Sequence, residues 1–299
     1  MQRKIVYFIN PISGGKTKEA ALKKIVEKTT LQQIPFEILP TNVTGDYSFL
    51  NEKITNEKIT DIVICGGDGT VNSIVKTLIN TDINIGIIPM GSGNGLAFAA
   101  QIPKQTDKAL DIIFKGKAAY IDSFLINEEF GCMLCGIGLD ASVAHAFAKQ
   151  PQRGLITYIQ LSLYQFFRAR PYFFELFLNG RIFTTEAYFI SIANANQFGN
   201  HFTIAPKASL NDGLMDIVIV KKMSKWKMVW LLVKQIRYGQ LNRYSDMSLH
   251  KSNILYFQTD KISIHNCSNA LLHIDGDPAP SVKKLTISII INAFRLIQP

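Results

Sequence analysis

The residues best suited to chemistry lie in one short run, residues 65–72, where three glycines fall within four positions. The run follows an apolar, strand-like stretch at residues 61–64 and leads into a helix-like stretch at residues 73–79. Glycines let the backbone turn sharply and expose its N–H groups, while Asp68 and Thr70 add a metal-seeking carboxylate and a hydroxyl. Such a turn predicts a binding site for a phosphorylated ligand.

Two further glycine-rich turns, at residues 10–16 and 91–95, fall at predicted strand ends. One such turn is weak evidence, but three at the same edge of one sheet indicate a ligand site. The first turn nearly forms a P-loop, yet Asn10 stands where the first glycine belongs, so we expect no true P-loop. Lys16, at the start of a helix, can still meet a phosphate; the alternative is a solvated surface lysine.

The elements that must position these turns alternate between strand and helix over the first third of the chain. This alternation predicts a parallel sheet covered by helices, in which ligands bind at the carboxyl ends of the strands. We expect an α/β nucleotide-binding domain over residues 1–118, with residues 288–299 as a candidate segment to complete it. Strands are predicted at residues 4–9, 36–39, 61–64 and 85–89, and helices at 17–28, 47–51 and 72–79.

Beyond residue 118 the pattern changes to alternating apolar and polar positions, which is typical of antiparallel strands. A second, β-rich domain is therefore expected over residues 119–287. Two helices should interrupt it, one at residues 141–170 with a break near Pro151 and one at residues 224–238. Its strands are predicted at residues 120–127, 173–177, 183–193, 215–220, 261–265 and 271–274.

Composition narrows the class of protein. The 299 residues are 47% hydrophobic and 18% charged, which is enough for a substantial core, and Lys and Arg exceed Asp and Glu by 32 to 23. The excess favours an anionic partner, but no nucleic-acid motif is present, so we expect no nucleic-acid binding. No apolar run approaches the roughly 20 residues that span a bilayer. Four cysteines indicate a reducing, cytoplasmic location, with Cys132 and Cys135 as buried thiols.

Five motifs in order resemble the diacylglycerol kinase catalytic-domain family, which includes bacterial lipid kinases, sphingosine kinases and ceramide kinases. The resemblance extends over nearly the whole chain. The motifs are Asn10-Pro11 with Ser13-Gly14-Gly15-Lys16, the Gly66–Thr70 run, Gly91-Ser92-Gly93-Asn94, the segment Asn211–Asp216, and Asp275-Gly276-Asp277.

The resemblance implies transfer of the γ-phosphoryl group of ATP, with Mg²⁺, to the hydroxyl of a lipid such as diacylglycerol or a sphingoid-type alcohol. It places the nucleotide in a cleft between the α/β domain and an antiparallel, β-sandwich-like domain. Thr41 matches a Thr-x-x-x-Gly-Asp pattern through Gly45 and Asp46, for which a turn ahead of a helix is the alternative. The implied nucleotide-binding residues are Asn10, Lys16, Thr41, Gly66, Gly67, Asp68, Gly69, Thr70, Val71, Asn72, Gly91, Ser92, Gly93 and Asn94.

Two aspartates are the implied catalytic residues. Asp68 is suited to hold the catalytic Mg²⁺, because Mg²⁺ favours one or two carboxylates together with substrate phosphates; the alternative is an aspartate that stabilises its own turn. Asp277 stands where the family usually has Glu, as the base for the lipid hydroxyl, and must sit closer to it because it is one methylene shorter. Its alternative role is a turn residue before Pro278. Gly95 departs from the aspartate of many bacterial members and resembles the sphingosine and ceramide kinase branch.

A second, structural Mg²⁺ site is implied at Asp212, completed by the backbone carbonyls of Ser209 and Leu214. The alternative is a hairpin turn, since Asn211-Asp212-Gly213 is a strong turn signal, and the two interpretations are compatible.

The sequence gives weaker signals for the residues that would contact a lipid. Residues 155–174 hold six aromatic side chains that could line an acyl pocket, although ordinary core is the favoured interpretation. In residues 221–236, lysines flank an apolar stripe that begins with Trp226 and Trp230, which fits a helix on an anionic membrane or a helix packed on the sheet.

The sequence therefore favours a lipid kinase at the membrane surface, with two rivals. One is an NAD kinase, whose family shares the Gly-Gly-Asp-Gly-Thr turn. The other is a catalytically impaired nucleotide- or lipid-binding protein, suggested by Gly95 and Asp277. The identity of the lipid and whether the chain forms a homodimer stay open.

Overall fold

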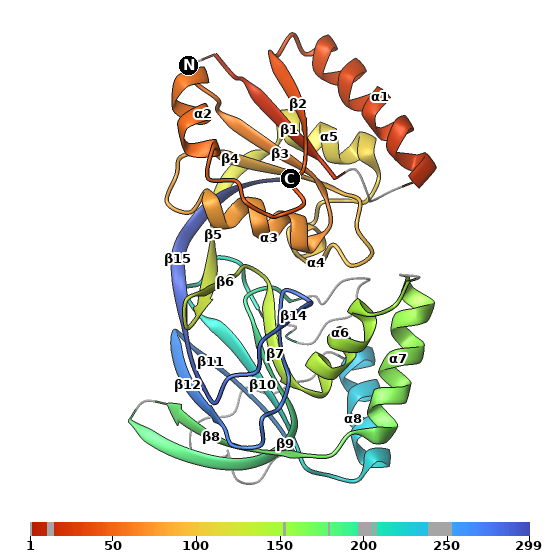
Figure 1. Cartoon of the computed structure of the whole chain (residues 1–299), viewed down its shortest axis with the longest axis vertical. Helices are drawn as coiled ribbons and strands as arrows, with labels where there is room; N and C mark the ends of the chain where they lie inside the picture. The colour runs from red at the N-terminus through yellow and green to blue at the C-terminus, as the bar shows by residue number, and fades with distance from the viewer. Residues whose placement is uncertain are drawn as a thin grey trace. The chain divides into compact units, whose positions relative to one another are not determined.

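The computed structural model describes residues 2–10, 15–151, 154–178, 180–196, 205, 208–238 and 253–299 (Figure 1). Two compact units make up the chain: Met1–Asp122 with Ile291–Pro299, and Ser123–Ile290. The chain passes from the first unit to the second within β5 (Lys117–Ile126) and returns within β15 (Lys284–Gln298). The expected two-domain fold class, parallel α/β first and antiparallel second, is confirmed by the strand pairing described next.

The first unit is built on a parallel sheet with strand order β4-β3-β1-β2. The last residues of β15 extend it, since Arg295 pairs in parallel with Asn84. β1 and β3 are buried along their whole length, as expected for parallel strands covered on both faces. The four strands are β1 (Ile5–Ile9), β2 (Phe36–Pro40), β3 (Asp61–Gly66) and β4 (Asn84–Pro89).

The helices of the first unit differ from the expectation mainly where they begin. The helix predicted at residues 72–79 begins at Asp68, inside the glycine run, and the one predicted at 47–51 begins at Leu50. Two helices that the sequence pattern did not predict follow β4. The helices are α1 (Gly15–Leu31), α2 (Leu50–Glu57), α3 (Asp68–Thr77), α4 (Gly95–Ala99) and α5 (Thr106–Lys115).

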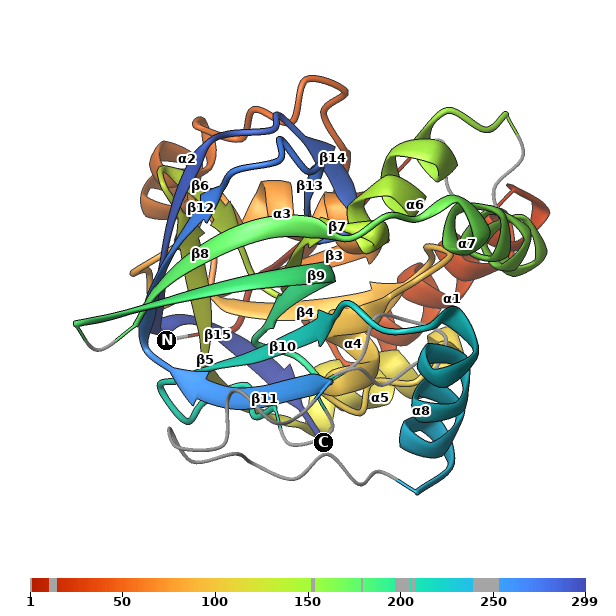
Figure 2. The same ribbon diagram turned by 90° about the horizontal axis from the view of Figure 1, so that it is seen from below.

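The second unit is antiparallel and organised around one long strand, β9. The first half of β9 pairs with β8, and its second half pairs with both β7 and β10. Figure 2 shows β8, β9, β10 and β11 following one another, in agreement with their pairing. The strands besides β5 and β15 are β6 (Glu129–Gly131), β7 (Leu134–Gly138), β8 (Tyr172–Leu178), β9 (Arg181–Ala193), β10 (Met215–Lys221), β11 (Ile254–Thr259), β12 (Lys261–Asn266), β13 (Leu272–Ile274) and β14 (Asp277–Ala279).

The helices in the described part of the second unit are α6 (Leu139–Ala148), α7 (Leu155–Arg168) and α8 (Lys225–Tyr238). The predicted break near Pro151 and the predicted helix at residues 224–238 are confirmed. Among the described residues, no helix is long and apolar enough to cross a bilayer.

The expectation that residues 155–174 form ordinary core is wrong for most of α7. Phe166 is buried, but Ile156, Leu163 and Phe167 are 74%, 55% and 64% exposed. The helix is amphipathic, and the structure leaves much of its apolar face uncovered.

Candidate functional site

The described residues that follow β1, β2, β3 and β4 lie at one edge of the parallel sheet, because the strands of a parallel sheet end on the same side. Thr41 follows β2 and donates its N–H to the Ile9 carbonyl at 3.1 Å. Asn10 follows β1 and donates to the Cys65 carbonyl of β3, also at 3.1 Å. Met90 continues the pattern after β4, with a bond to the Gly66 carbonyl at 2.9 Å.

The run after β3 forms the first turn of α3. Gly67 is the N-cap residue, in an extended conformation, and Asp68, Gly69 and Thr70 follow it as the first helical residues. The first N–H groups of a helix lack intrahelical acceptors, and the helix dipole adds positive potential there. Val71 turns into the core at 2% exposure, whereas Asn72 is half-buried on the accessible side.

Two glycine turns touch each other through their backbones. A Cβ atom built on Gly91 would lie 2.5 Å from the Gly67 Cα, and one built on Gly67 would lie 3.0 Å from the Gly91 Cα. A side chain at either position would therefore push the two turns apart. Glycine at both positions lets the two backbones pass close together beside the start of α3.

Asn94 shapes the turn after β4. Its side-chain Oδ1 accepts the N–H of Gly91, and its Nδ2 donates to the Gly91 carbonyl, both at 2.8 Å. Asn94 is 2% exposed and adopts a left-handed conformation, φ 55°, which Asn tolerates better than most residues. The side chain thus braces its own loop, while Ser92 at the tip is exposed and Gly93 is half-buried.

Asn10 links two of the turns, since its Nδ2 donates to the Thr70 hydroxyl at 3.1 Å. Lys16 is the second residue of α1, but its side chain lies outside the described part of the structure, as do residues 11–14. The expected phosphate contact of Lys16 therefore stays a prediction.

A polar cavity of about 540 Å³ opens between the loop after β2 and α3. Asp46 sits on its rim, where hydrogen bonds from Ser48, including the backbone N–H at 2.9 Å, hold the pKa of the carboxyl below its usual value. Motif reasoning identified the loop and Asn72 of α3 but missed Ser73, Lys76 and Thr77, which complete the wall. The cavity is lined by Thr44, Gly45, Asp46, Tyr47, Ser48, Asn51, Asn72, Ser73, Lys76 and Thr77.

In the second unit, Asp277 is the first residue of β14 and is exposed. It pairs with Ile274 across a two-residue turn formed by Asp275 and Gly276, both at positive φ, 50° and 87°. Two positive φ angles characterise a type I′ hairpin turn, and Asp-Gly is a favoured sequence for it. Because Asp275 in the turn is held by the hydrogen bonds described next, the hairpin fixes the backbone position of Asp277.

Asp275 is the anchor, and motif reasoning did not assign it this role. Its buried carboxylate accepts the backbone N–H groups of Cys132, Met133 and Leu134 at 2.9, 2.9 and 3.0 Å. These donors lie more than 140 residues away in sequence, so no local spacing could have revealed the contact.

The buried side chain of His273 contacts the same hairpin. Gly276 donates its N–H to His273 Nδ1 at 3.3 Å, and His273 Nε2 lies 3.6 Å from Asp140 Oδ2. Gly136 makes room for this pair, because a Cβ there would lie 2.5 Å from His273 Nε2.

Asp212 lies in an exposed turn before β10; β9, the preceding strand that pairs with β10, ends at Ala193, so the turn is not a tight hairpin. Its Oδ1 accepts the Leu214 N–H and its Oδ2 accepts Gln258 Nε2, both at 3.2 Å. Ser209 contacts the same turn through Asn211, hydroxyl to Oδ1 at 3.0 Å. Ser209, Asp212 and Leu214 are thus together on one turn, and their role toward a metal stays a prediction.

The cysteines offer no activated nucleophile inside the core. Burial raises the pKa of the Cys65 and Cys135 thiols well above the ordinary value, so both stay protonated and unreactive. Cys132 is also buried and contacts the Asp275 carboxylate, which agrees with the expectation of buried thiols.

Exposed apolar side chains occur on α8 as well as on α7. Lys225 at the start of α8 binds the Phe167 carbonyl near the end of α7. Trp226 and Trp230 are 83% and 61% exposed, whereas Met228 faces inward and is fully buried. Val233 and Ile236, which continue the stripe, have side chains outside the described part.

Comparison with known proteins covers nearly the full chain. Residues 4–126 match the diacylglycerol kinase catalytic domain, and residues 134–298 match the YegS C-terminal NAD kinase beta sandwich-like domain. A diacylglycerol kinase of Bacillus subtilis (strain 168) is 24% identical over 279 residues, which are 92% of this chain and 89% of that protein. An uncharacterized protein of Synechocystis sp. is 26% identical over 281 residues, and the chain spans 64% of its length.

A crystal structure of a diacylglycerol kinase from Bacillus anthracis str. Sterne superposes with a TM-score of 0.74 at 19% identity. The match covers 99% of this chain and 97% of the other. At this level of identity the likeness shows the fold alone.

Proposed function

Because the chain belongs to the diacylglycerol kinase catalytic-domain family, we propose that it transfers the γ-phosphoryl group of ATP to the hydroxyl of a lipid alcohol. The acceptor class is diacylglycerol or a sphingoid-type alcohol. The observation that carries the proposal is the pair of touching glycine turns beside the start of α3, with Asp68 and Thr70 in its first turn. Phosphoryl transfer needs mainly positioning and charge neutralisation, which backbone N–H groups and a helix N-terminus can supply.

The polar cavity beside α3 supports a place for the nucleoside. Its volume of about 540 Å³ falls within the usual range for small-ligand sites, roughly 300–1,000 Å³. Its walls carry hydroxyls and amides that can hydrogen-bond a ribose or a base, and Asn72 in its wall lies four residues after Asp68 on the same helix.

The donor set fits Mg²⁺, which prefers hard oxygen ligands and combines one or two carboxylates with substrate phosphates. Asp68 would hold the ion near the phosphates, and Asp212 with the carbonyls of Ser209 and Leu214 would hold a second, structural one. The ion would neutralise charge on the transferred group. The amide of Asn10 and the hydroxyl of Thr70, already bonded to each other, add polar atoms beside Asp68.

Asp277 is the proposed general base. It would accept the proton of the lipid hydroxyl as that oxygen attacks the γ-phosphorus. Its exposure leaves the carboxylate accessible, and the hairpin anchored by Asp275 fixes its backbone, which helps a side chain one methylene shorter than Glu reach a defined position. If Asp68 and Asp277 serve one reaction, replacing either of them should remove the activity.

A lipid substrate calls for contact with a membrane surface. The exposed apolar side chains of α7 and α8 support such a contact, because aromatic rings flanked by basic residues are typical of interfacial helices. Arg168, Lys225 and Lys227 supply positive charge around Phe167 and Trp226. The proposal therefore has α7 and α8 lying on an anionic bilayer.

NAD kinase is the second candidate, since the match to the second unit is described as an NAD kinase beta sandwich-like domain. The order of the five motifs favours a lipid acceptor. The same assay can decide between them when both acceptors are supplied.

The test is phosphorylation with γ-labelled ATP, Mg²⁺ and four acceptors in turn: diacylglycerol, sphingosine and ceramide in mixed micelles, and NAD. We expect a labelled lipid from wild type and a loss of at least about 100-fold in kcat for Asp68→Ala and Asp277→Asn. Asp260→Asn, at an exposed aspartate of the second unit between β11 and β12, is the matched control and should keep full activity.

The outcomes separate the candidates. Labelled NAD without labelled lipid would make the protein an NAD kinase. Nucleotide binding without turnover on any acceptor would make it a binding protein. Gly91→Ala tests the close contact between the two glycine turns and should weaken ATP binding, whereas Gly154→Ala, where a Cβ meets open space, should not.

A further inference from the structure

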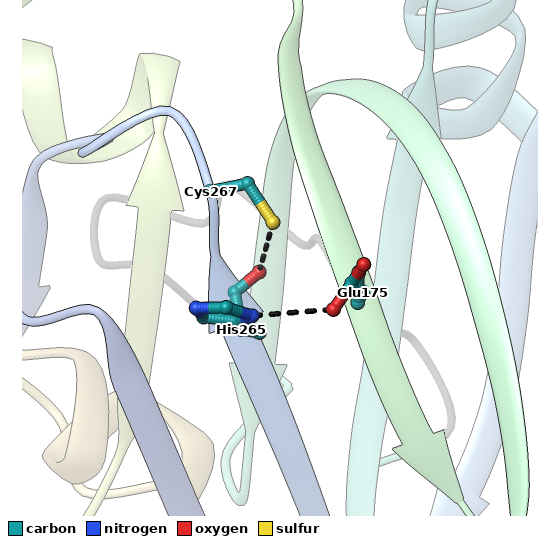
Figure 3. A group of neighbouring side chains, drawn as sticks. All are labelled: Glu175, His265 and Cys267. Carbon is teal, nitrogen blue, oxygen red and sulfur yellow. Dashed lines mark hydrogen bonds and ion pairs between the residues drawn. The ribbon is translucent and has the colours of Figure 1, made fainter.

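Three side chains with metal-binding atoms gather on the second unit, apart from every residue proposed above: Glu175, His265 and Cys267 (Figure 3). Glu175 of β8 and His265 of β12 are direct partners across the two strands, so their side chains project from the same face of the sheet. Cys267 lies two residues beyond His265, just after the end of β12.

The distances suit one shared ion. His265 Nδ1 lies 3.2 Å from Glu175 Oε2, and the ligand atoms of all three residues lie within 4.8 Å of one another. With metal bonds of roughly 2.0–2.3 Å in a tetrahedral zinc site, neighbouring ligand atoms stand about 3.3–3.6 Å apart. The Glu175–His265 pair, at 3.2 Å, is close to this separation, and the Cys267 sulfur lies within 4.8 Å of both ligand atoms.

Few contacts fix the Cys267 side chain in its place, so it can turn toward a bound ion. Cys267 is exposed, and its thiol contact is a weak one, 3.6 Å to the carbonyl of His265. Lys284 of β15 pairs with His265 on its other side, but it is exposed, so its flexible stem can keep the ammonium group in water.

We propose that Glu175, His265 and Cys267 bind a thiophilic divalent cation of the Zn²⁺ class, with the fourth coordination position open to water. One thiolate, one imidazole and one carboxylate are ligands that Zn²⁺ accepts, whereas Mg²⁺ prefers oxygen ligands alone. The site is therefore chemically distinct from any Mg²⁺ that serves phosphoryl transfer. The bound ion ties β8 to the end of β12, where the chain turns toward β13.

Cobalt(II) is the probe, because it replaces zinc in such sites and its bond to a thiolate gives a charge-transfer absorption. The full chain is stripped with a chelator and titrated with Co²⁺ and then Zn²⁺. We expect one equivalent of Co²⁺ to bind with this absorption and Zn²⁺ to displace it. Cys267→Ser should abolish the absorption, and Glu175→Gln and His265→Gln should each weaken binding at least tenfold.

The controls use the chain's own residues. Glu186→Gln, an exposed glutamate of the neighbouring strand β9, should bind Co²⁺ like wild type. Since Cys267 is the exposed one of the four cysteines, Zn²⁺ should also protect the wild-type chain from a thiol reagent. A wild type that takes up no ion at micromolar Zn²⁺, or a Cys267→Ser variant that binds as tightly as wild type, would overturn the proposal. All four substitutions lie at accessible positions and should leave the fold intact. Circular dichroism of each variant checks this.

Discussion

Asp275 and Asp277 stand two residues apart and do different work. Asp275 turns inward and accepts three backbone N–H groups of residues 132–134, while Asp277 is exposed at the start of β14. A linear motif can identify such a pair but cannot say which carboxylate is structural. The three-dimensional contact separates the two roles.

Unfolding measurements should distinguish the two aspartates. Asp275→Ala leaves three buried N–H groups without their acceptor, so we expect the free energy of unfolding to fall by about 3 kcal/mol. Asp277→Asn, at an exposed position, should change it by less than about 0.5 kcal/mol while removing activity. Urea denaturation followed by circular dichroism gives both values. Equal losses in the two variants would contradict the division of roles.

Tyr7 makes the stability of the first unit sensitive to alkali. The residue is fully buried in β1, its hydroxyl pairs with Thr29 at 2.8 Å, and burial raises its pKa from 10.0 to about 12. The folded state therefore keeps this proton between pH 10 and 12, while the unfolded chain loses it, and stability falls as pH rises through that window.

The Tyr7 contribution amounts to about 2–3 kcal/mol at pH 12. Tyr7→Phe should flatten the decline in unfolding free energy above pH 10, at a cost of about 1 kcal/mol at pH 7 for the lost hydrogen bond. Tyr47 is shifted in the same direction by burial, so a smaller slope persists. An unchanged slope in Tyr7→Phe would show that other groups control the alkaline loss.

At the scale of elements, the apolar strands of the first unit were predictable and the start of α3 was not. Buried parallel strands read as continuous apolar runs, which a pattern detects easily. Glycine is a poor helix former, so the pattern placed the helix after the glycine run. In the structure the helix nevertheless begins at Asp68. The residues of the glycine run therefore lie at a helix N-terminus.

Short elements escaped prediction for a related reason. β7 contains two glycines in five residues, β14 has three residues, and α4 has five. None is long enough to show a period, and β7 pairs with β9 and β13, which lie far away in sequence, whereas β14 pairs with its neighbour β13.

α8 carries a prediction of its own, since the side chains of Trp226 and Trp230 are exposed. Trp226→Ala with Trp230→Ala should leave the fold intact, because both rings are largely exposed, and should weaken binding to anionic vesicles by about tenfold or more. Co-sedimentation with vesicles of phosphatidylcholine and phosphatidylglycerol measures the change. Val43→Ser, which removes an 88% exposed apolar residue from the first unit, is the control. Unchanged vesicle binding in the double variant would exclude α8 as the contact.

At the scale of the whole molecule, the C-terminal strand connects the two units. β15 begins by pairing with β12 in the second unit and ends by pairing with β4 in the first. The apolar pattern of β15 could be recognised in the sequence. Its parallel pairing with β4 could not be predicted, because Arg295 and Asn84 are far apart along the chain. The first unit is therefore complete only when the last residues have been added.

The core contribution of these last residues can be measured with two variants of one strand. Phe294 is fully buried in the first unit, so Phe294→Ala should lower its free energy of unfolding by about 3–5 kcal/mol. Ile291→Ala, three residues earlier and 60% exposed, should cost less than about 1 kcal/mol. Hydrogen exchange of the β4 and β3 amides reports on the first unit specifically. Faster exchange only in Phe294→Ala is expected, because removal of the ring leaves a cavity beside β4; equal protection in both variants would mean that the strand adds no stability there.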